Sequence, residues 1–357
     1  MKKVLLGLVL LATISFGCVE DDPHSSKVLE LGLSTKELYA KGVTAQQLYM
    51  AGTTLEKLVQ ADVPVSELAD IDPVCLHDIL MAGAAVEELS DFIKLTSPEL
   101  NDLLEQGFGI GFLARSGYDE RLKNEGYLGT LTDIDGNTYD WVKTGNQIWM
   151  ADALRTSRYS DGEPITKEMT GREMVMLEDS VKCYLDPCDA NPITSEEYCN
   201  ALPGYCYTYT AATRQYYAGM GQKIKGVCPD GWRLPTKEDI EILREYTSSN
   251  YPPESYQSSL MAPYLWDEST MKGDDFYGFS AIPNGNYYYD YLTGFLYISN
   301  SPAWAAYYWT SERNDAFDNE FIDYRATYWS LGGNQLFMST ADKRSALCVR
   351  CILESLD

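Results

Sequence analysis

The chain has 357 residues, with 53 acidic and 28 basic side chains, and its formal net charge is −25. That length is enough for two domains, and the acid excess excludes the basic surface that nucleic-acid binding requires. The chain has two histidines, His24 and His77, so no imidazole base or ligand follows residue 77. Catalysis by paired carboxylates stays open, because acidic residues are abundant.

Residues 1–17 have the layout of a secretory signal peptide. Lys2-Lys3 precede an apolar run, and Ser15-Phe16-Gly17 leads into Cys18. A cysteine here indicates a lipobox, in which Cys18 becomes the acylated N-terminus. Ordinary secretion is the alternative, because Ser15 stands where a lipobox usually has leucine. Residues 18–27 form an acidic linker similar to the surface-export signal of Bacteroidetes lipoproteins. We therefore expect a protein that is lipid-anchored in the outer membrane and exposed at the cell surface.

Residues 28–117 carry a short internal repeat, from which we predict a small all-α array of short helices. Leucine recurs every ten residues, and glycine recurs between the leucines, as in Gly42-Val-Thr-Ala-Gln-Gln-Leu48. Ser34 with Glu37, and Thr44 with Gln47, have the spacing of capping boxes. Each unit is too short to be stable alone, so the leucines must stack between units. The array is interpreted as a spacer, with a protein-binding surface as the alternative.

Residues 118–126 are predicted to be a charged hinge, after which the pattern changes to short runs rich in Tyr, Trp, Thr and Val. A helix is expected from Thr236 to Tyr246, where Thr236 and Asp239 form a capping pair and Ile240, Leu243 and Tyr246 share a face. One helix among many strands predicts an α+β domain.

Six ordered motifs in residues 127–353 resemble the Fibrobacter succinogenes major paralogous domain. They include Gly145-Asn-Gln-Ile-Trp-Met-Ala151, Val227-Cys-Pro-Asp-Gly-Trp-Arg-Leu-Pro235, Gly278-Phe-Ser-Ala-Ile-Pro283 and Cys348-Val-Arg-Cys351. The resemblance implies a C-type lectin-like fold in which N- and C-terminal strands pair, and an exported protein, often a lipoprotein. It implies no established activity, so fold and location are the stronger expectations.

Nine cysteines in an exported chain predict a disulfide framework, and their spacing disfavours zinc. The resemblance implies two bridges, Cys183–Cys199 and Cys228–Cys351. Three further cysteines, Cys188, Cys206 and Cys348, look additional to the family pattern, and Cys188 with Cys206 would form a bridge of their own.

Two groups of residues are candidates for binding. Asp133-Ile-Asp-Gly-Asn137 begins like a calcium loop, but position twelve is Thr144 rather than glutamate, so a hairpin turn is favoured. A structural calcium ion is the alternative, and no other cofactor is expected. Tyrosine and tryptophan are dense in residues 287–309. Because side chains alternate along a strand, some of these rings face solvent, and the candidate ligand contacts are Tyr288, Tyr291, Tyr297 and Trp304. Trp232 and Trp309 are assigned to the core.

These observations favour a surface lipoprotein with a ligand-binding domain that is not an enzyme. The expected partner is a polysaccharide or a cell-surface protein, besides the membrane through the lipid anchor. A structural or protein-interaction module of the envelope is the first alternative. A formylglycine-generating-type enzyme, which shares the lectin-like fold and uses cysteines, is the second.

Overall fold

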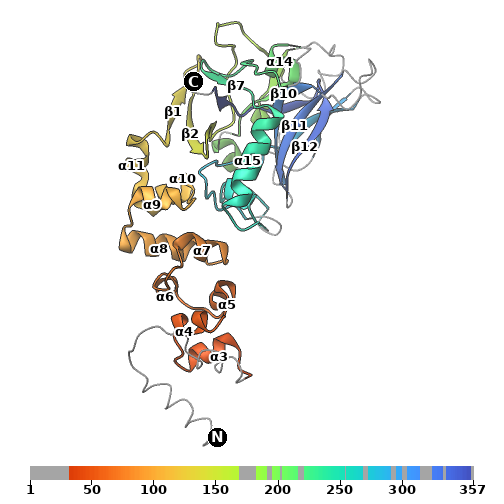
Figure 1. Ribbon diagram of the computed structural model, residues 1–357. Coiled ribbons are helices and arrows are strands. Elements are labelled where there is room, and N and C mark those ends of the chain that lie inside the picture. Colours follow the sequence, from red (N-terminus) through yellow and green to blue (C-terminus); the bar gives the residue numbers. More distant parts are fainter. Residues whose placement is uncertain are drawn as a thin grey trace, which may run out of the picture. The chain divides into compact units, whose positions relative to one another are not determined.

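The computed structural model describes residues 32–168, 182–190, 195–201, 203–215, 221–253, 255–267, 272–290, 295–299, 304–313, 324–332 and 335–354. The predicted signal peptide, the linker and Cys18 lie outside these residues. The chain forms two compact units, residues 1–84 and residues 85–357 (Figure 1).

Short helices recur along the first unit. They are α3 (Thr35–Ala40), α4 (Ala45–Met50), α5 (Leu55–Gln60), α6 (Val65–Leu68) and α7 (Leu76–Met81). The first two begin with the expected capping boxes, in which Ser34 pairs with Glu37 and Thr44 with Gln47. Gly42 and Gly52 follow α3 and α4 with φ of 91° and 92°, a conformation that glycine adopts without strain. Capping and glycine together explain why α3 and α4 each stop after six residues.

The recurring leucines form the core of the first unit. Leu38, Leu48, Leu58 and Leu68 are at most 2% exposed. Helix α3 packs on α5 and α5 on α7, while α4 packs on α6, so helices two units apart are neighbours. Each buried leucine contributes about 1.5–3 kcal/mol relative to exposure, which is how helices of two turns become stable.

The second unit begins with helices that the sequence analysis assigned elsewhere. They are α8 (Val86–Thr96), α9 (Leu100–Glu105), α10 (Ile110–Leu113), the π-helical turn η1 (Ala114–Tyr118) and α11 (Asp119–Asn124). The predicted array was to run to residue 117, but residues 85–117 belong to the second unit. The backbone N–H of Phe112 donates to the carbonyl of Phe276 at 2.7 Å, and a Cβ on Gly111 would lie 2.2 Å from the Gly278 nitrogen.

The predicted hinge at 118–126 is largely helix α11. Its charged side chains pair along the helix, with Lys123 bonded to Asp119 at 2.5 Å and Arg121 to Glu125 at 2.8 Å. Leu122 is fully buried. Pairs four residues apart and one buried leucine are features of a short amphipathic helix rather than of a hinge.

One sheet joins the N- and C-terminal parts of the second unit. Its order is β1-β2-β3-β14-β7, with bounds β1 (Leu128–Thr132), β2 (Thr138–Thr144), β3 (Gln147–Met150), β14 (Ile352–Leu353) and β7 (Trp232–Arg233). All its pairs are antiparallel, and Ile352 of β14 lies between Trp149 of β3 and Arg233 of β7. The last strand therefore pairs beside the first strands.

A second sheet of nine strands among the described residues has the order β12-β11-β10-β13-β6-β5-β4, with β8 and β9 as a hairpin beside β13. The bounds are β4 (Thr166–Glu168), β5 (Cys183–Leu185), β6 (Cys206–Thr208), β8 (Asn286–Asp290), β9 (Phe295–Ser299), β10 (Ala305–Arg313), β11 (Arg325–Gly332), β12 (Gln335–Asp342) and β13 (Ala346–Cys348). Strand β13 pairs with β10, β6 and β8, which makes it the centre of this sheet.

Helix α15 (Lys237–Ser249) is fixed to both sheets at its first turn. The predicted capping pair of Thr236 and Asp239 is present, and Arg233 of β7 forms two hydrogen bonds with the Asp239 carboxylate at 2.6 and 3.0 Å. Glu312 of β10 accepts from the backbone N–H of Lys237 at 3.0 Å. The smaller helices are α12 (Pro187–Ala190), α13 (Glu196–Asn200), α14 (Tyr209–Thr213) and the 3₁₀ turn η3 (Ser258–Leu260).

The main core of the second unit lies between the two sheets. Side chains from the first sheet, such as Tyr139 and Met150, join Tyr207, Trp309 and Leu347 of the second in one buried cluster. Trp232 and Trp309 are buried as expected. Helices and sheets in one unit agree with the predicted α+β class. Among the described residues, no helix combines the length and apolar character that a membrane crossing needs.

Candidate functional site

Two of the four predicted ligand contacts have exposed side chains. Tyr288 of β8 is 42% exposed, and Trp304, which directly precedes β10, is 49% exposed. Tyr287 is buried, so the expected alternation holds between Tyr287 and Tyr288, although Asn286 at the start of β8 is buried as well. Tyr297 of β9 is the backbone partner of Tyr288, but its side chain, like all of Tyr291, lies outside the described structure.

Tyr288 and Trp304 come from neighbouring segments of the nine-stranded sheet. An isolated bridge joins Gly285, just before β8, to Ala306 of β10. Strand β8 also pairs with β13, which pairs with β10. Two exposed aromatic rings are thus carried by the strands around β13.

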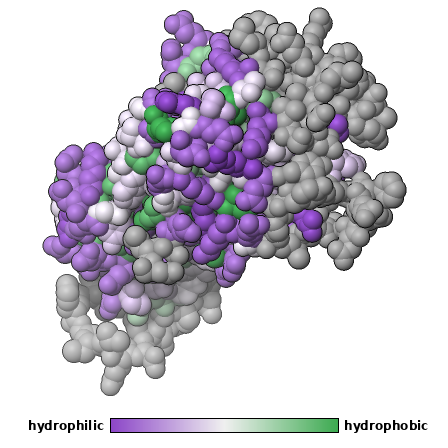
Figure 2. Space-filling view, turned by 90° about the horizontal axis from the view of Figure 1, so that it is seen from above, coloured by the Kyte–Doolittle hydropathy of each residue, from purple (hydrophilic) through white to green (hydrophobic). Residues whose placement is uncertain are grey.

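Trp304 differs from the other tryptophans in its exposure. The chain has seven tryptophans, and five of them are under 8% exposed: Trp149, Trp232, Trp266, Trp309 and Trp329. Trp141 packs against the core and is partly buried. On the face shown in Figure 2, hydrophilic residues cover most of the coloured surface, and hydrophobic ones lie in separate small areas. The half-exposed indole of Trp304 is therefore accessible from solvent, unlike those packed in the core.

A cavity of about 240 Å³ lies where α9 and α10 meet the sheet and α15. It is lined by Leu104, Glu105, Phe108, Gly109, Ile110, Tyr127, Lys143, Gly145, Tyr246 and Tyr277. All of these residues belong to the second unit. Four aromatic rings, one ammonium group and one carboxylate thus converge from separate parts of the chain.

Local geometry positions the rings of this cavity. The Lys143 ammonium lies 5.3 Å from the centroid of the Tyr127 ring, and the Tyr246 and Tyr277 rings lie 5.6 Å apart. Gly145, at φ +60°, lets the Tyr246 ring lie against the backbone, where a Cβ would come within 2.9 Å of it. Burial raises the pKa of Tyr246, so its hydroxyl stays neutral and can hydrogen-bond. The rings that line this cavity can stack on a ligand, and its hydroxyl, ammonium and carboxylate groups can hydrogen-bond to it.

This cavity was not predicted from the sequence. Tyr246 was predicted only as part of the apolar face of α15, and the other rings come from segments that no motif connects. The closest signal was Gly145-Asn-Gln in the family-like motif, because a glycine between two strands often marks a close backbone approach.

The candidate calcium loop is a hydrogen-bonded turn between β1 and β2, as favoured from the sequence. Asp133 accepts from the backbone N–H groups of Asp135 and Asn137 at 2.9 Å, and from the Tyr139 hydroxyl at 2.6 Å. Asp135 accepts from the backbone N–H of Ser157 at 2.6 Å. Burial acts to raise the pKa of Asp135, but its hydrogen bonds outweigh this and the pKa is lowered. Protein donors therefore bind both carboxylates of this turn.

Two disulfides are present among the described residues, and one predicted pairing is confirmed. Cys228 is bonded to Cys351, as expected. Cys199 is bonded to Cys188, whereas Cys183 was the predicted partner, so the pairings Cys183–Cys199 and Cys188–Cys206 are wrong.

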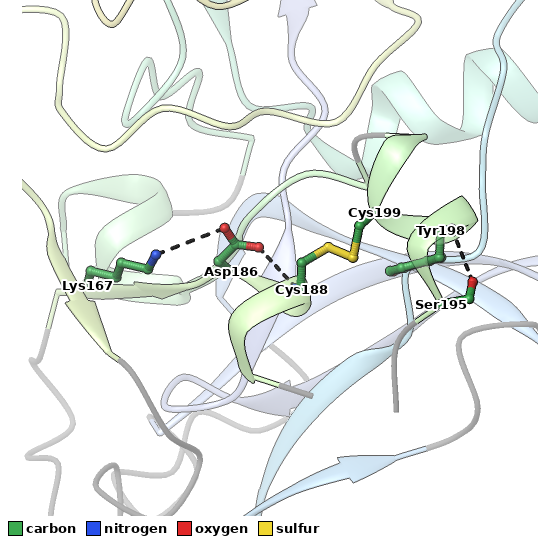
Figure 3. Close-up of a disulfide and its surroundings, with 6 residues drawn as sticks. All are labelled: Lys167, Asp186, Cys188, Ser195, Tyr198 and Cys199. Atoms are coloured by element: carbon green, nitrogen blue, oxygen red, sulfur yellow. Dashed lines mark hydrogen bonds and ion pairs between the residues drawn. A yellow bond between two sulfur atoms is a disulfide. The ribbon is translucent and has the colours of Figure 1, made fainter. Parts of the chain in front are cut away.

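The short helices explain the corrected pairing. Cys188 lies on α12 and Cys199 on α13, with Cα atoms 5.8 Å apart, within the usual range for a disulfide (Figure 3). Asp186 orients the first of these helices by accepting from the Cys188 N–H at 3.0 Å. Cys183 instead lies in strand β5, where it is fully buried.

Cys75, Cys183, Cys206 and Cys348 are the described cysteines outside these two disulfides. The last three are fully buried. No group of acidic, cysteine or histidine side chains within the described ranges has the arrangement of a metal site.

Comparison with known proteins gives one match. A family model described as the Fibrobacter succinogenes major domain matches residues 142–353, which is more than half of the chain. No curated protein and no solved structure matches.

Proposed function

Because this chain belongs to the Fibrobacter succinogenes major domain family, we propose that it is a surface lipoprotein whose C-terminal unit binds a polysaccharide without catalysing a reaction. The observation that carries the proposal is the tyrosine-walled cavity beside Lys143. Aromatic rings offer flat faces to sugar C–H groups, while hydroxyl, ammonium and carboxylate groups bond to sugar hydroxyls. At about 240 Å³ the cavity lies below the usual range of about 300–1,000 Å³, which favours a single sugar unit of a chain over a larger ligand.

The exposed rings of Tyr288 and Trp304 supply a second contact region for the same polymer. Exposed rings outside the cavity suit a ligand of several sugar units rather than one. A polysaccharide is therefore the ligand that uses both features of the second unit. A cell-surface protein is the competing partner.

The proposed location depends on the N-terminal sequence. The signal-peptide layout of residues 1–17, the following Cys18 and the acidic residues after it support acylation and display on the outer membrane. The short helices of the first unit would then serve as a spacer between anchor and binding domain. The pairing of β14 beside β3 supports a C-type lectin-like fold for the second unit.

The proposal that the protein is not an enzyme has separate support. A formylglycine-generating-type reaction needs accessible cysteines, and Cys206 and Cys348 are fully buried. Turnover of a peptide substrate by the purified protein, with copper added, would reverse this part of the proposal.

A pulldown on insoluble polysaccharides tests the binding function. The mature chain with Cys18→Ser should be retained on at least one plant polysaccharide, and Tyr127→Ala or Trp304→Ala should weaken retention about tenfold, which equals about 1.4 kcal/mol. Tyr264→Ala is the matched control, since Tyr264 is 50% exposed and lies outside both regions. Absence of retention on every polysaccharide would exclude this function and favour the protein partner.

A further inference from the structure

Two buried thiols face each other at the centre of the nine-stranded sheet. Cys206 of β6 and Cys348 of β13 are Cα partners across an antiparallel ladder. Their sulfur atoms are 3.5 Å apart, and both residues are fully buried. Cys206 was predicted to pair with Cys188, which the Cys188–Cys199 bond excludes.

The backbone already has a separation that a disulfide accepts. Residues directly opposite on antiparallel strands have Cα atoms about 4.5–5.5 Å apart, and disulfides span about 4.4–6.8 Å. The two sulfurs must approach from 3.5 Å to about 2.05 Å, which side-chain rotation supplies without moving either strand.

The surroundings do not favour a reactive thiolate. Hydrogen bonding to Cys348, burial and the negative charge of Asp186 all raise the pKa of Cys206. Tyr198 beside the pair is 5% exposed. A thiolate is the species that attacks a disulfide, so exchange at this site is slow once the sheet has closed. A bond between these sulfurs must therefore form while the chain is still folding.

We propose that Cys206 and Cys348 form a third disulfide in the exported protein, made during folding by exchange with an oxidising disulfide. One thiolate attacks a sulfur of the oxidant and gives a mixed disulfide. The second thiolate displaces the oxidant's remaining sulfur. Two electrons pass to the oxidant, which leaves as a dithiol or two thiols, and the two thiol protons are transferred to it. Export, as proposed above, supplies the oxidising compartment.

This bond would fix one short segment to both sheets. Cys348 belongs to β13 in the nine-stranded sheet, and Cys351 immediately precedes β14 in the five-stranded sheet. Cys351 is already bonded to Cys228. With the third bond, Cys348 would be bonded to β6 within the nine-stranded sheet, while Cys351 is bonded to Cys228, four residues before β7 of the five-stranded sheet.

Thiol counting after refolding tests the proposal without depending on export. The mature chain with Cys18→Ser is reduced, unfolded and refolded in a glutathione–glutathione disulfide buffer, and its thiols are then counted in denaturant. Two thiols, from Cys75 and Cys183, are expected, whereas four would remain without the third bond. Four thiols in the refolded chain would overturn the proposal.

Matched variants and peptide mapping identify the partners. Cys206→Ser should raise the count from two to three by freeing Cys348, and Cys183→Ser should lower it to one. Trypsin releases Cys348 between Arg344 and Arg350, and chymotrypsin releases Cys206 between Tyr205 and Tyr207. A mass that joins these two peptides is expected. A peptide that joins Cys348 to Cys183 would overturn the assignment, and wild-type mapping decides the matter even if a variant does not fold.

Discussion

Removing the disulfide between Cys228 and Cys351 should cost the second unit more stability than removing the one between Cys188 and Cys199. The first closes a separation of 123 residues and the second only 11. The chain-entropy relation gives about 5 kcal/mol for the longer loop and about 3 kcal/mol for the shorter one. Each disulfide is removed by changing both of its cysteines to alanine.

The third disulfide proposed above lowers the stability loss expected for the Cys228–Cys351 bond. If Cys206 and Cys348 are bonded, the shortest route between Cys228 and Cys351 runs 22 residues to Cys206 and 3 residues from Cys348. A loop of about 25 residues corresponds to about 3.5 kcal/mol. The same double change should therefore lose about 3.5 kcal/mol in the wild-type background and about 5 kcal/mol once Cys206 and Cys348 are alanine.

Urea unfolding without reductant, followed by tryptophan fluorescence, measures these losses. All seven tryptophans lie in residues 141–329, so the signal reports the second unit. Midpoints and slopes give each free energy of unfolding. In the background in which Cys206 and Cys348 are alanine, equal losses for the loops of 11 and 123 residues would refute the entropic argument. A loss for the longer loop that is the same in both backgrounds would refute the coupling.

Two further predictions concern side-chain burial. Leu48→Ala should destabilise the first unit by about 2–5 kcal/mol, because Leu48 is fully buried, while Met50→Ala, at a side chain 58% exposed, should change little. Circular dichroism at 222 nm during thermal unfolding compares the two, and similar effects would contradict the leucine core. Burial raises the pKa of Asp275 to about 6, so this carboxyl stabilises the fold below about pH 4 and loses that contribution as pH rises through 6. The free energy of unfolding of Asp275→Asn relative to wild type should therefore rise by on the order of 3 kcal/mol between pH 4 and pH 7. Melting temperatures of both proteins measured across this range test it, and a difference independent of pH would contradict the buried carboxyl.

Local features were predictable because they depend on nearby residues. The capping boxes at Ser34 and Thr44 and the start of α15 after Thr236 follow from spacings of three residues. Burial of the ten-residue leucines follows from the period itself. The turn at Asp133 was readable for the same reason, since its donors lie within six residues.

Features that depend on distant segments were not predictable in the same way. The partner of Cys199 depends on strand β5 ending at Leu185 and helix α12 beginning at Pro187. No sequence pattern in this segment reveals that boundary. The cavity at Tyr246 needs α9, β2 and α15 to meet. The residues of helix α11 were predicted to be a charged hinge, although the spacing of four residues between their charges fits a helix equally well.

The glycine contact near α10 has a practical consequence for protein preparation. Phe108, Phe112 and Phe276 stack on one another, with ring centroids 5.1–6.2 Å apart, at the place where Gly111 meets Gly278. Cloning boundaries drawn at the start of the family match, residue 142, would strip two of these rings away and leave Phe276 facing water. A fragment for crystallisation or binding work should start before Val86. A shorter fragment would expose an apolar surface that is buried in the full chain, and such a surface promotes aggregation.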